Sequence, residues 1–270
     1  MSEVAEALKH VKALTFDVFG TVVDWRSTVH NQLIKYGKAK IDSPTFGTLS
    51  ETLQARLREI TDDDWAEFAQ AWRDSYIDFV RTFIPGQTKW KDIDTHHHDS
   101  LVVLMMEWGV SGAYTDQELR SLSLIWHFLK PWPDSALGIQ RLGTQYVTCT
   151  LSNGNRSLLD DLNTHGNLGF RRIISSADYG AYKPHPSVYL GAADSLGCQP
   201  HEVAMVAAHL SDLNAARQNG LRTIYVERHG EGGFSSDSQS FKDAREWVDL
   251  WVSESEEGFV EVARKLGVST

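Results

Sequence analysis

The sequence has little cysteine: only Cys149 and Cys198 occur in 270 residues. Two cysteines cannot supply the disulfide framework of a small secreted domain. Cys149 lies in an apolar strand pattern, where a small buried thiol is the expected role. A chain of this length can bury a large apolar core, so we expect a fold that is stabilised by packing.

Long apolar runs and an excess of basic residues are also missing. No stretch reaches the roughly 18 apolar residues of a membrane span, and the first residues lack an apolar segment behind a basic tip. The formal net charge is −10, and Lys and Arg form no cluster that could bind a phosphate backbone. We therefore expect a soluble, cytoplasmic protein that binds neither membranes nor nucleic acid.

Strands alternate with helices in the second half of the chain. Together with the apolar, β-branched segment 11–23, this alternation is typical of an α/β domain with a doubly wound parallel sheet. A last strand and helix are expected within 247–266. The other predicted strands are 146–151, 172–175, 203–207 and 223–226, and the predicted helices are 136–142, 157–164, 186–196 and 213–218.

The segment between residues 24 and 130 predicts helices and no strand. The clearest helix starts at the cap Thr61 and ends before Pro85, with apolar residues three and four positions apart. Arg73 lies at the edge of this apolar face, from which its guanidinium could reach a neighbouring cleft or simply the solvent. Further helices are predicted from residue 94 or 95 to 108 and at 116–129. We thus expect a helical unit, 24–130, inserted into an α/β core made of 1–23 and 131–270.

The triplet 96–98, three histidines in a row, does not predict a metal site. Adjacent residues of a helix point in different directions and cannot share one ion well.

Polar residues follow the ends of the core strands. Each has a structural explanation, because an Asp before a turn can be a turn residue and Asp212 can cap the helix that begins near 213. Their joint occurrence favours a ligand site, because the carboxyl ends of parallel strands meet at one edge of the sheet. The residues are Asp17, Thr21, Ser152, Asn153, Lys183, His209 and Asp212.

Four ordered segments carry a family resemblance. They are Phe16-Asp17-Val18-Phe19-Gly20-Thr21, Leu151-Ser152-Asn153-Gly154, Tyr182-Lys183-Pro184 with Tyr189, and Val206-Ala207-Ala208-His209-Leu210-Ser211-Asp212. In this order they resemble the motifs of the haloacid dehalogenase superfamily, and the inserted helices resemble the cap of its type II subgroup, the 2-haloacid dehalogenases. The resemblance implies a Rossmann-like core with a helical cap.

Two positions separate this chain from the phosphatases of that superfamily. Those enzymes carry an acid–base Asp two residues after the nucleophile and a metal-binding Asp in the last motif, where this chain has Phe19 and Ala208. Mg²⁺ prefers hard oxygen ligands, and phosphoryl transfer depends on its charge. We therefore expect an enzyme without metal or other cofactor.

The resemblance also implies a role for each residue. Asp17 would attack the halogen-bearing carbon of a short 2-halo acid, and water would hydrolyse the resulting ester to a 2-hydroxy acid with inversion. Lys183 would keep Asp17 ionised, and Asp212 would orient Lys183 or the water. The remaining roles are halide binding by Arg73 and Asn153, contacts to the substrate carboxylate or the nucleophile by Thr21 and Ser152, a hydrogen bond within this network by Tyr189, and an apolar wall formed by Phe19 and Trp25.

One departure from the family pattern is His209. Well-known members carry a Ser and an Asn in this motif to position water, and both are absent here. An imidazole at this position could be the base for ester hydrolysis or only a hydrogen-bonding spacer, and the sequence leaves both open.

Other functions also stay open at this stage. The same pocket could open another carbon–heteroatom bond, such as the ring of azetidine-2-carboxylate. A phosphatase and a non-catalytic binding protein are further alternatives, and the family makes a homodimer an expectation.

Overall fold

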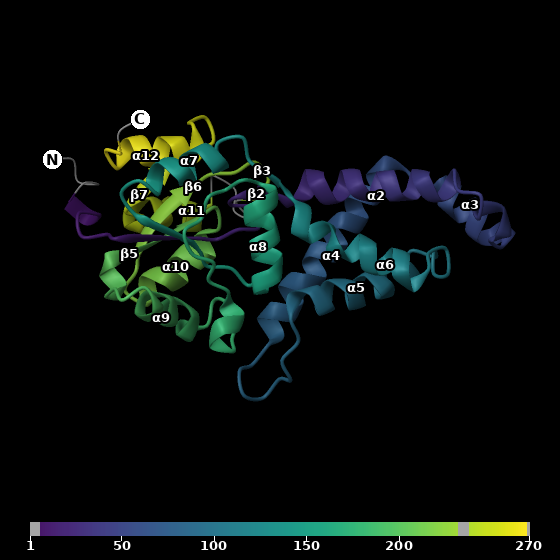
Figure 1. Ribbon diagram of the computed structural model, residues 1–270, viewed down its shortest axis with the longest axis horizontal. Coiled ribbons are helices and arrows are strands. Elements are labelled where there is room, and N and C mark those ends of the chain that lie inside the picture. The colour runs from purple at the N-terminus through teal and green to yellow at the C-terminus, as the bar shows by residue number, and fades with distance from the viewer. Residues whose placement is uncertain (1–5, 232–237, 269–270) are drawn as a thin grey trace. The chain divides into compact units, whose positions relative to one another are not determined.

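The computed structural model describes residues 6–231 and 238–268. The chain forms two compact units, Met1–Asp24 with Lys130–Thr270, and Trp25–Leu129 (Figure 1). The first unit is the α/β core, and the second is the helical insertion that was expected over 24–130.

A five-stranded parallel sheet organises the core. The strands are β1 (Ala13–Phe16), β4 (Val147–Thr150), β5 (Val203–Ala207), β6 (Arg222–Val226) and β7 (Leu250–Val252), in the order β4-β1-β5-β6-β7. The strands continue on both sides of β1, which makes the sheet doubly wound as predicted. Phe16 is level with Thr150 of β4 and Val206 of β5, so the residues after these three strands meet at one edge of the sheet.

The strand predicted at 172–175 is wrong. This segment makes only isolated bridges to the edge of the sheet, Cys149 with Arg172 and Ser152 with Ser175. Between them, the hydroxyl of Thr150 accepts a hydrogen bond from the backbone N–H of Ile174 (2.9 Å) and donates one to its carbonyl (3.0 Å). A side chain thus takes the place of the backbone partner that a ladder would need.

Helices cover both faces of the sheet (Figure 1). On one face lie α7 (Ser135–Leu142) and α12 (Gly258–Lys265), where Phe16 meets Phe259 edge to face, with ring centroids 5.2 Å apart. On the other face lie α9 (Pro186–Ser195) and α10 (Leu210–Gln218), packed against alternate strand residues such as Met205. Burial on both faces explains why the strands are rich in apolar residues and show no simple polar–apolar alternation; the polar residues buried in them are threonines such as Thr15, Thr148 and Thr150. The described part of the core also contains α8 (Arg156–His165), α11 (Gln239–Trp247) and the short 3₁₀-helices η3 (Ser176–Tyr179) and η4 (Pro200–Glu202).

The inserted unit is helical. Its elements are α2 (Trp25–Ile41), η1 (Phe46–Thr48), α3 (Glu51–Glu59), α4 (Asp62–Thr82), α5 (Ile93–Glu107), α6 (Asp116–Ser123) and the 3₁₀-helix η2 (Leu124–Phe128). The helix predicted over 116–129 therefore changes to 3₁₀ geometry at Leu124. The sequence analysis missed α3, which buries only Leu57 and so shows little apolar periodicity.

Aromatic rings fill the interior of the inserted unit. Trp25 stacks on Trp126 (centroids 6.1 Å apart), and His97 stacks on the same ring (4.4 Å). His96 instead stacks on Phe79 (4.4 Å). Neighbouring histidines therefore serve different packing contacts.

Two very short strands belong to the core at the points where the chain enters and leaves the insertion. β2 (Val23–Asp24) and β3 (Lys130–Pro131) pair antiparallel. None of the helices in residues 6–231 and 238–268 combines the length and apolar character that crossing a bilayer requires.

Candidate active site

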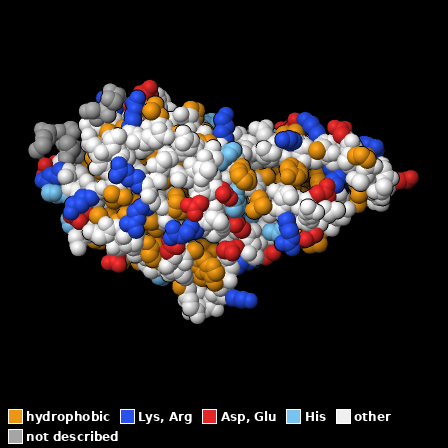
Figure 2. Space-filling view, viewed as in Figure 1, with side chains coloured by type: hydrophobic (Ala, Val, Ile, Leu, Met, Phe, Trp, Pro, Cys, Tyr) orange, Lys and Arg blue, Asp and Glu red, His pale blue; other side chains and the backbone are white. Residues whose placement is uncertain are grey.

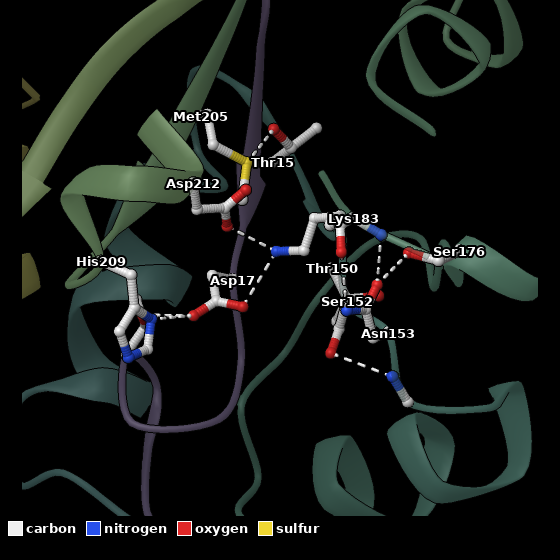
Figure 3. A network of polar contacts seen from close by, with 12 residues as sticks. Thr15, Asp17, Thr150, Ser152, Asn153, Ser176, Lys183, Met205, His209 and Asp212 are labelled. Carbon is white, nitrogen blue, oxygen red and sulfur yellow. Dashed lines mark hydrogen bonds and ion pairs between the residues drawn. The ribbon is translucent and has the colours of Figure 1, made fainter. Parts of the chain in front are cut away.

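Asp17 lies just beyond the end of β1, with its backbone N–H donating to the carbonyl of Val206 (3.0 Å). The ammonium group of Lys183 donates to Asp17 Oδ1 (2.9 Å) and to Asp212 Oδ2 (2.6 Å). Figure 3 shows the Lys183 nitrogen between the two carboxylates. All three side chains are almost fully buried, with exposed fractions of 7% for Lys183 and 11% for each Asp. One cation therefore serves two acids that lie 195 residues apart in the sequence (212 − 17).

Electrostatics keep Asp17 ionised. Burial by itself would raise the pKa of Asp17, but the charges and hydrogen bonds of Lys183 and His209 outweigh burial and hold that pKa well below its usual range. Burial, and secondly the Asp17 charge, raise the pKa of Asp212. Burial alone would lower the pKa of Lys183, but the two carboxylates raise it. At neutral pH, Asp17 is thus a desolvated carboxylate, which is the form that a nucleophile needs.

The second oxygen of Asp17 is held by different groups. Thr21 Oγ1 donates to Asp17 Oδ2 (2.8 Å), and His209 Nδ1 lies 2.9 Å from the same oxygen. The backbone N–H of Ala208 donates in turn to Thr21 Oγ1 (2.9 Å). This chain of bonds fixes the orientation of the carboxylate, in agreement with the proposed contact between Thr21 and the nucleophile.

His209 lies between two carboxylates. Its Nε2 is 3.2 Å from Glu231 Oε2, while its Nδ1 faces Asp17. Burial would lower the pKa of His209, but the hydrogen bonds and charges of Asp17 and Glu231 raise it to about 9. At neutral pH the ring is therefore an imidazolium that donates from both nitrogens.

Glu231 is a site residue that the sequence analysis missed. The Gly- and Ser-rich composition of 230–238 predicts a polar surface loop, which is wrong for Glu231, since its side chain is only 6% exposed; residues 232–237 lie outside the described residues. A signal was available, because Glu231 follows the carboxyl end of β6 at the same edge of the sheet.

Tyr189 completes the support of the cation. Its hydroxyl donates to Asp212 Oδ1 (2.6 Å), as the predicted network role requires. Both oxygens of Asp212 are therefore engaged, one by Tyr189 and the other by Lys183, and its role in orienting Lys183 or the water stays a prediction.

Asn153 holds the loop that carries Lys183. Asn153 Oδ1 accepts from the Lys183 backbone N–H (2.7 Å) and from Ser176 Oγ (2.8 Å), both drawn in Figure 3. Ser152 is buried, and its hydroxyl accepts a bond from the Gly154 N–H (3.3 Å). Their roles toward halide and substrate stay predictions.

Phe19 and Ala208 bring no oxygen ligand to the site. The Phe19 ring is buried and packs so closely on Gly154 that a Cβ there would lie 3.2 Å from it. Ala208 is also buried. Within residues 6–231 and 238–268, no three or more His, Cys, Asp or Glu are grouped so that they could hold a metal ion.

Arg228 braces the loop after β1. Its guanidinium makes a bidentate pair with Asp134 (2.6 and 2.8 Å), and its Nε donates to the Thr21 carbonyl (3.0 Å). The sequence analysis did not identify this residue, although it also follows the end of β6.

Arg73 and Trp25 belong to the helical unit. Arg73 is buried, with its guanidinium 4.7 Å from the centre of the Tyr76 ring and 5.4 Å from that of Trp25. Trp25 is also fully buried. Trp72, from the same face of α4, donates from Nε1 to the carbonyl of His97 (3.1 Å) and is a core residue. The contribution of Arg73 and Trp25 to halide and substrate binding stays a prediction.

Residues 11–220 match the family described as haloacid dehalogenase-like hydrolase. The crystal structure of the L-2-haloacid dehalogenase PA0810 is 33% identical, with a TM-score of 0.78 over 96% of this chain and 100% of that one. The structure of the defluorinating L-2-haloacid dehalogenase Rha0230 is 32% identical, with a TM-score of 0.75 over 95% of each chain. (S)-2-haloacid dehalogenase 1 of Pseudomonas sp. (strain CBS-3) is 26% identical over 81% of this chain and 85% of its own length.

Proposed function

The chain belongs to the haloacid dehalogenase-like hydrolases and, within them, to the 2-haloacid dehalogenases, and on this premise we propose that it converts short (S)-2-haloalkanoic acids into 2-hydroxy acids. The observation that carries the proposal is a buried, ionised Asp17 held by Lys183, with Phe19 and Ala208 where a phosphatase needs oxygen ligands. The similar proteins, named as 2-haloacid dehalogenases, support the same reaction.

The first step forms an ester. A carboxylate oxygen of Asp17 attacks the carbon that bears the halogen, the carbon–halogen bond breaks, and halide leaves with the bonding electrons. No proton moves, so the step needs no general acid, which fits the phenyl ring at position 19. Attack from the side opposite the halide inverts the configuration at that carbon.

The second step regenerates Asp17. Water adds to the carboxyl carbon of the ester. The bond then breaks between that carbon and the Asp17 oxygen that is attached to the substrate, which releases the 2-hydroxy acid. Lys183 and Thr21 already contact the oxygens of this carboxyl group, so their donors can stabilise the negative charge of the tetrahedral intermediate. The net reaction consumes one water and yields one halide ion and one proton.

The halide role of Arg73 rests on its surroundings in the helical unit. A guanidinium is weakly hydrated and packs on aromatic faces, and the rings of Tyr76 and Trp25 supply such faces. The indole Nε1 of Trp25 is buried and has no hydrogen-bond partner among the described residues. A large, polarisable anion suits this combination of cation, ring and N–H donor.

Halide release from 2-chloro-, 2-bromo- and 2-fluoroalkanoic acids tests the activity directly. Asp17→Asn should lower turnover by at least about 10³-fold, because an amide is not a nucleophile toward carbon. Asp161→Asn, an exposed Asp on α8, is the charge-matched control and should keep wild-type turnover.

The ester pathway has its own signature. With enzyme in excess over substrate in ¹⁸O-labelled water, the label should enter Asp17 and not the first molecule of product. Label in that first product would mean direct attack by water and would overturn the mechanism.

Azetidine-2-carboxylate and a chromogenic phosphate ester, the latter with and without Mg²⁺, should be assayed beside the 2-halo acids. If the enzyme turned over azetidine-2-carboxylate or the phosphate ester efficiently and released no halide from any 2-halo acid, the proposed substrate class would be wrong.

A further inference from the structure

The ring of His209 links the nucleophile to a second, different acid. His209 is the N-cap residue of α10 and lies two residues beyond the end of β5. Its Nδ1 is 2.9 Å from Asp17 Oδ2, and its Nε2 is 3.2 Å from Glu231 Oε2. Figure 3 shows His209 and Lys183 on opposite sides of the Asp17 carboxylate.

Glu231 is seated by the shape of the loop after β1. Gly20 has φ +81, and a Cβ built on it would lie 2.2 Å from Glu231 Oε2. The missing side chain at position 20 is therefore what lets the carboxylate approach the imidazole. Glu231 itself is almost fully buried, and this burial favours keeping the pair together.

We propose that Glu231 is a positioning residue that holds His209 as the general base for hydrolysis of the Asp17 ester. The inference rests on the proposed function and specifies how its second step is catalysed. It also decides between the two roles that the sequence left open for His209.

The charge around His209 changes during the reaction. Among the described residues, the charged groups that pair with the ring are Asp17, from the loop after β1, and Glu231, from the loop after β6. While both are ionised, the ring keeps its proton. Esterification removes the charge of Asp17, so one of the two groups that hold the proton is lost, and the pKa of His209 must fall from its resting value of about 9. The base thus becomes available only after the ester exists.

Glu231 also determines which nitrogen becomes the base. A carboxylate accepts a hydrogen bond from Nε2–H, so the proton that leaves the ring is the one on Nδ1. Nδ1 points at the carboxyl group of Asp17, whose carbon the water must attack. The lone pair on Nδ1 is therefore one hydrogen bond away from the attacking water.

The protons balance over the cycle. After esterification, His209 releases the Nδ1 proton to solvent, which is the proton that the net reaction yields. Nδ1 then takes a proton from the attacking water as the C–O bond forms. The tetrahedral intermediate then expels the 2-hydroxy acid, whose alkoxide oxygen takes the second proton of the water. Asp17 and the imidazolium are thereby restored.

Rapid-quench kinetics with a 2-chloroalkanoic acid separate the two steps. Glu231→Gln should leave the first burst of halide within about threefold of wild type but slow steady-state turnover about 10-fold or more. The ester should then be visible as an added mass on the intact protein. Its hydrolysis should also depend on pH differently from wild type, because the amide does not hold the histidine proton.

Two further variants sharpen the test. His209→Ala should accumulate the ester, and added imidazole should restore part of its hydrolysis. Glu246→Gln, an exposed residue of α11, is the charge-matched control and should behave like wild type.

The outcomes distinguish the two proposals. If wild type turns over 2-halo acids while Glu231→Gln hydrolyses its ester at the wild-type rate with an unchanged pH profile, the inference is overturned and the proposed function stands. An equal loss of burst and turnover, without ester, would assign Glu231 a purely structural role and would also overturn it. Wild type that releases no halide would overturn the proposed function, and this inference with it.

Discussion

At the scale of single residues, Lys183 has two partners with different tasks. Its ammonium group pairs with Asp17 and with Asp212, and the Tyr189 hydroxyl holds the other oxygen of Asp212. Removing one member of such a buried group leaves an uncompensated charge, which typically costs about 3–5 kcal/mol. Asp17, Lys183 and Asp212 thus depend on one another for their stability in the folded protein.

The titration of His209 predicts a pH dependence of stability. Its pKa is about 9 in the folded protein and near 6.5 without its partners, so its contribution is complete below about pH 6.5 and is lost as the pH rises through 9. Wild type should lose roughly 1–3 kcal/mol of unfolding free energy over this interval relative to His209→Gln. Urea denaturation of both proteins from pH 6 to pH 10 measures the difference. A constant difference across this range would contradict the charged state of the ring.

Most site residues of the core could be predicted from the sequence, because several of them follow a strand closely, while Lys183 and Tyr189 belong to a motif of the family. Asp17 is adjacent to β1, and His209 is two residues beyond β5. Glu231 is five residues beyond β6, in a loop rich in Gly and polar residues, and only the folded chain shows that its carboxylate turns inward onto Gly20. The bonds of Asn153 to the loop of Lys183 were equally invisible, because side-chain hydrogen bonds leave no periodicity in a sequence.

At the scale of elements, α4 depends on its first turn. Thr61 Oγ1 accepts from the Asp64 N–H, and Asp64 accepts from the Thr61 N–H, which forms a reciprocal cap. Thr61→Ala should therefore cost about 1 kcal/mol. Thr164→Ala, at an exposed position of α8, should change stability by less than about 0.5 kcal/mol. Thermal unfolding of both variants gives the comparison, and equal effects would mean that the cap contributes nothing specific.

Element boundaries show what sequence patterns can and cannot predict. The apolar face of α4 predicts a long helix because it repeats over several turns. The same periodicity does not distinguish α6 from the 3₁₀-helix η2, since spacings of three and four occur in both. The segment at 172–175 looks like a strand in composition, but the hydroxyl of Thr150 replaces its ladder partner.

At the scale of the whole molecule, charge is negative but dispersed. On the face drawn in Figure 2, Lys and Arg are interspersed with Asp and Glu, within a formal net charge of −10. A 2-haloalkanoate is an anion, so long-range repulsion should slow its approach, and salt should screen that repulsion. We expect kcat/KM to rise by up to about threefold from roughly 0.01 to 0.1 M ionic strength. A steep fall over this range would instead show that a local positive field steers the substrate.

The architecture of the core was predictable because alternating strands and helices permit few arrangements. The strand order was not, since it depends on which apolar faces pair in three dimensions. Phe16 illustrates this point: the sequence makes it a buried strand residue, and only the fold shows that it packs against Phe259, 243 positions further along the chain (259 − 16).

The pairing of β2 with β3 has a consequence for protein engineering. Asp24 and Lys130 are directly opposed in an antiparallel ladder, and two residues are enough to close such a ladder as a hairpin. The chain between these two residues could then be replaced by a tight turn. The five-stranded sheet and its catalytic edge would remain as a smaller scaffold, into which other inserted domains could be placed.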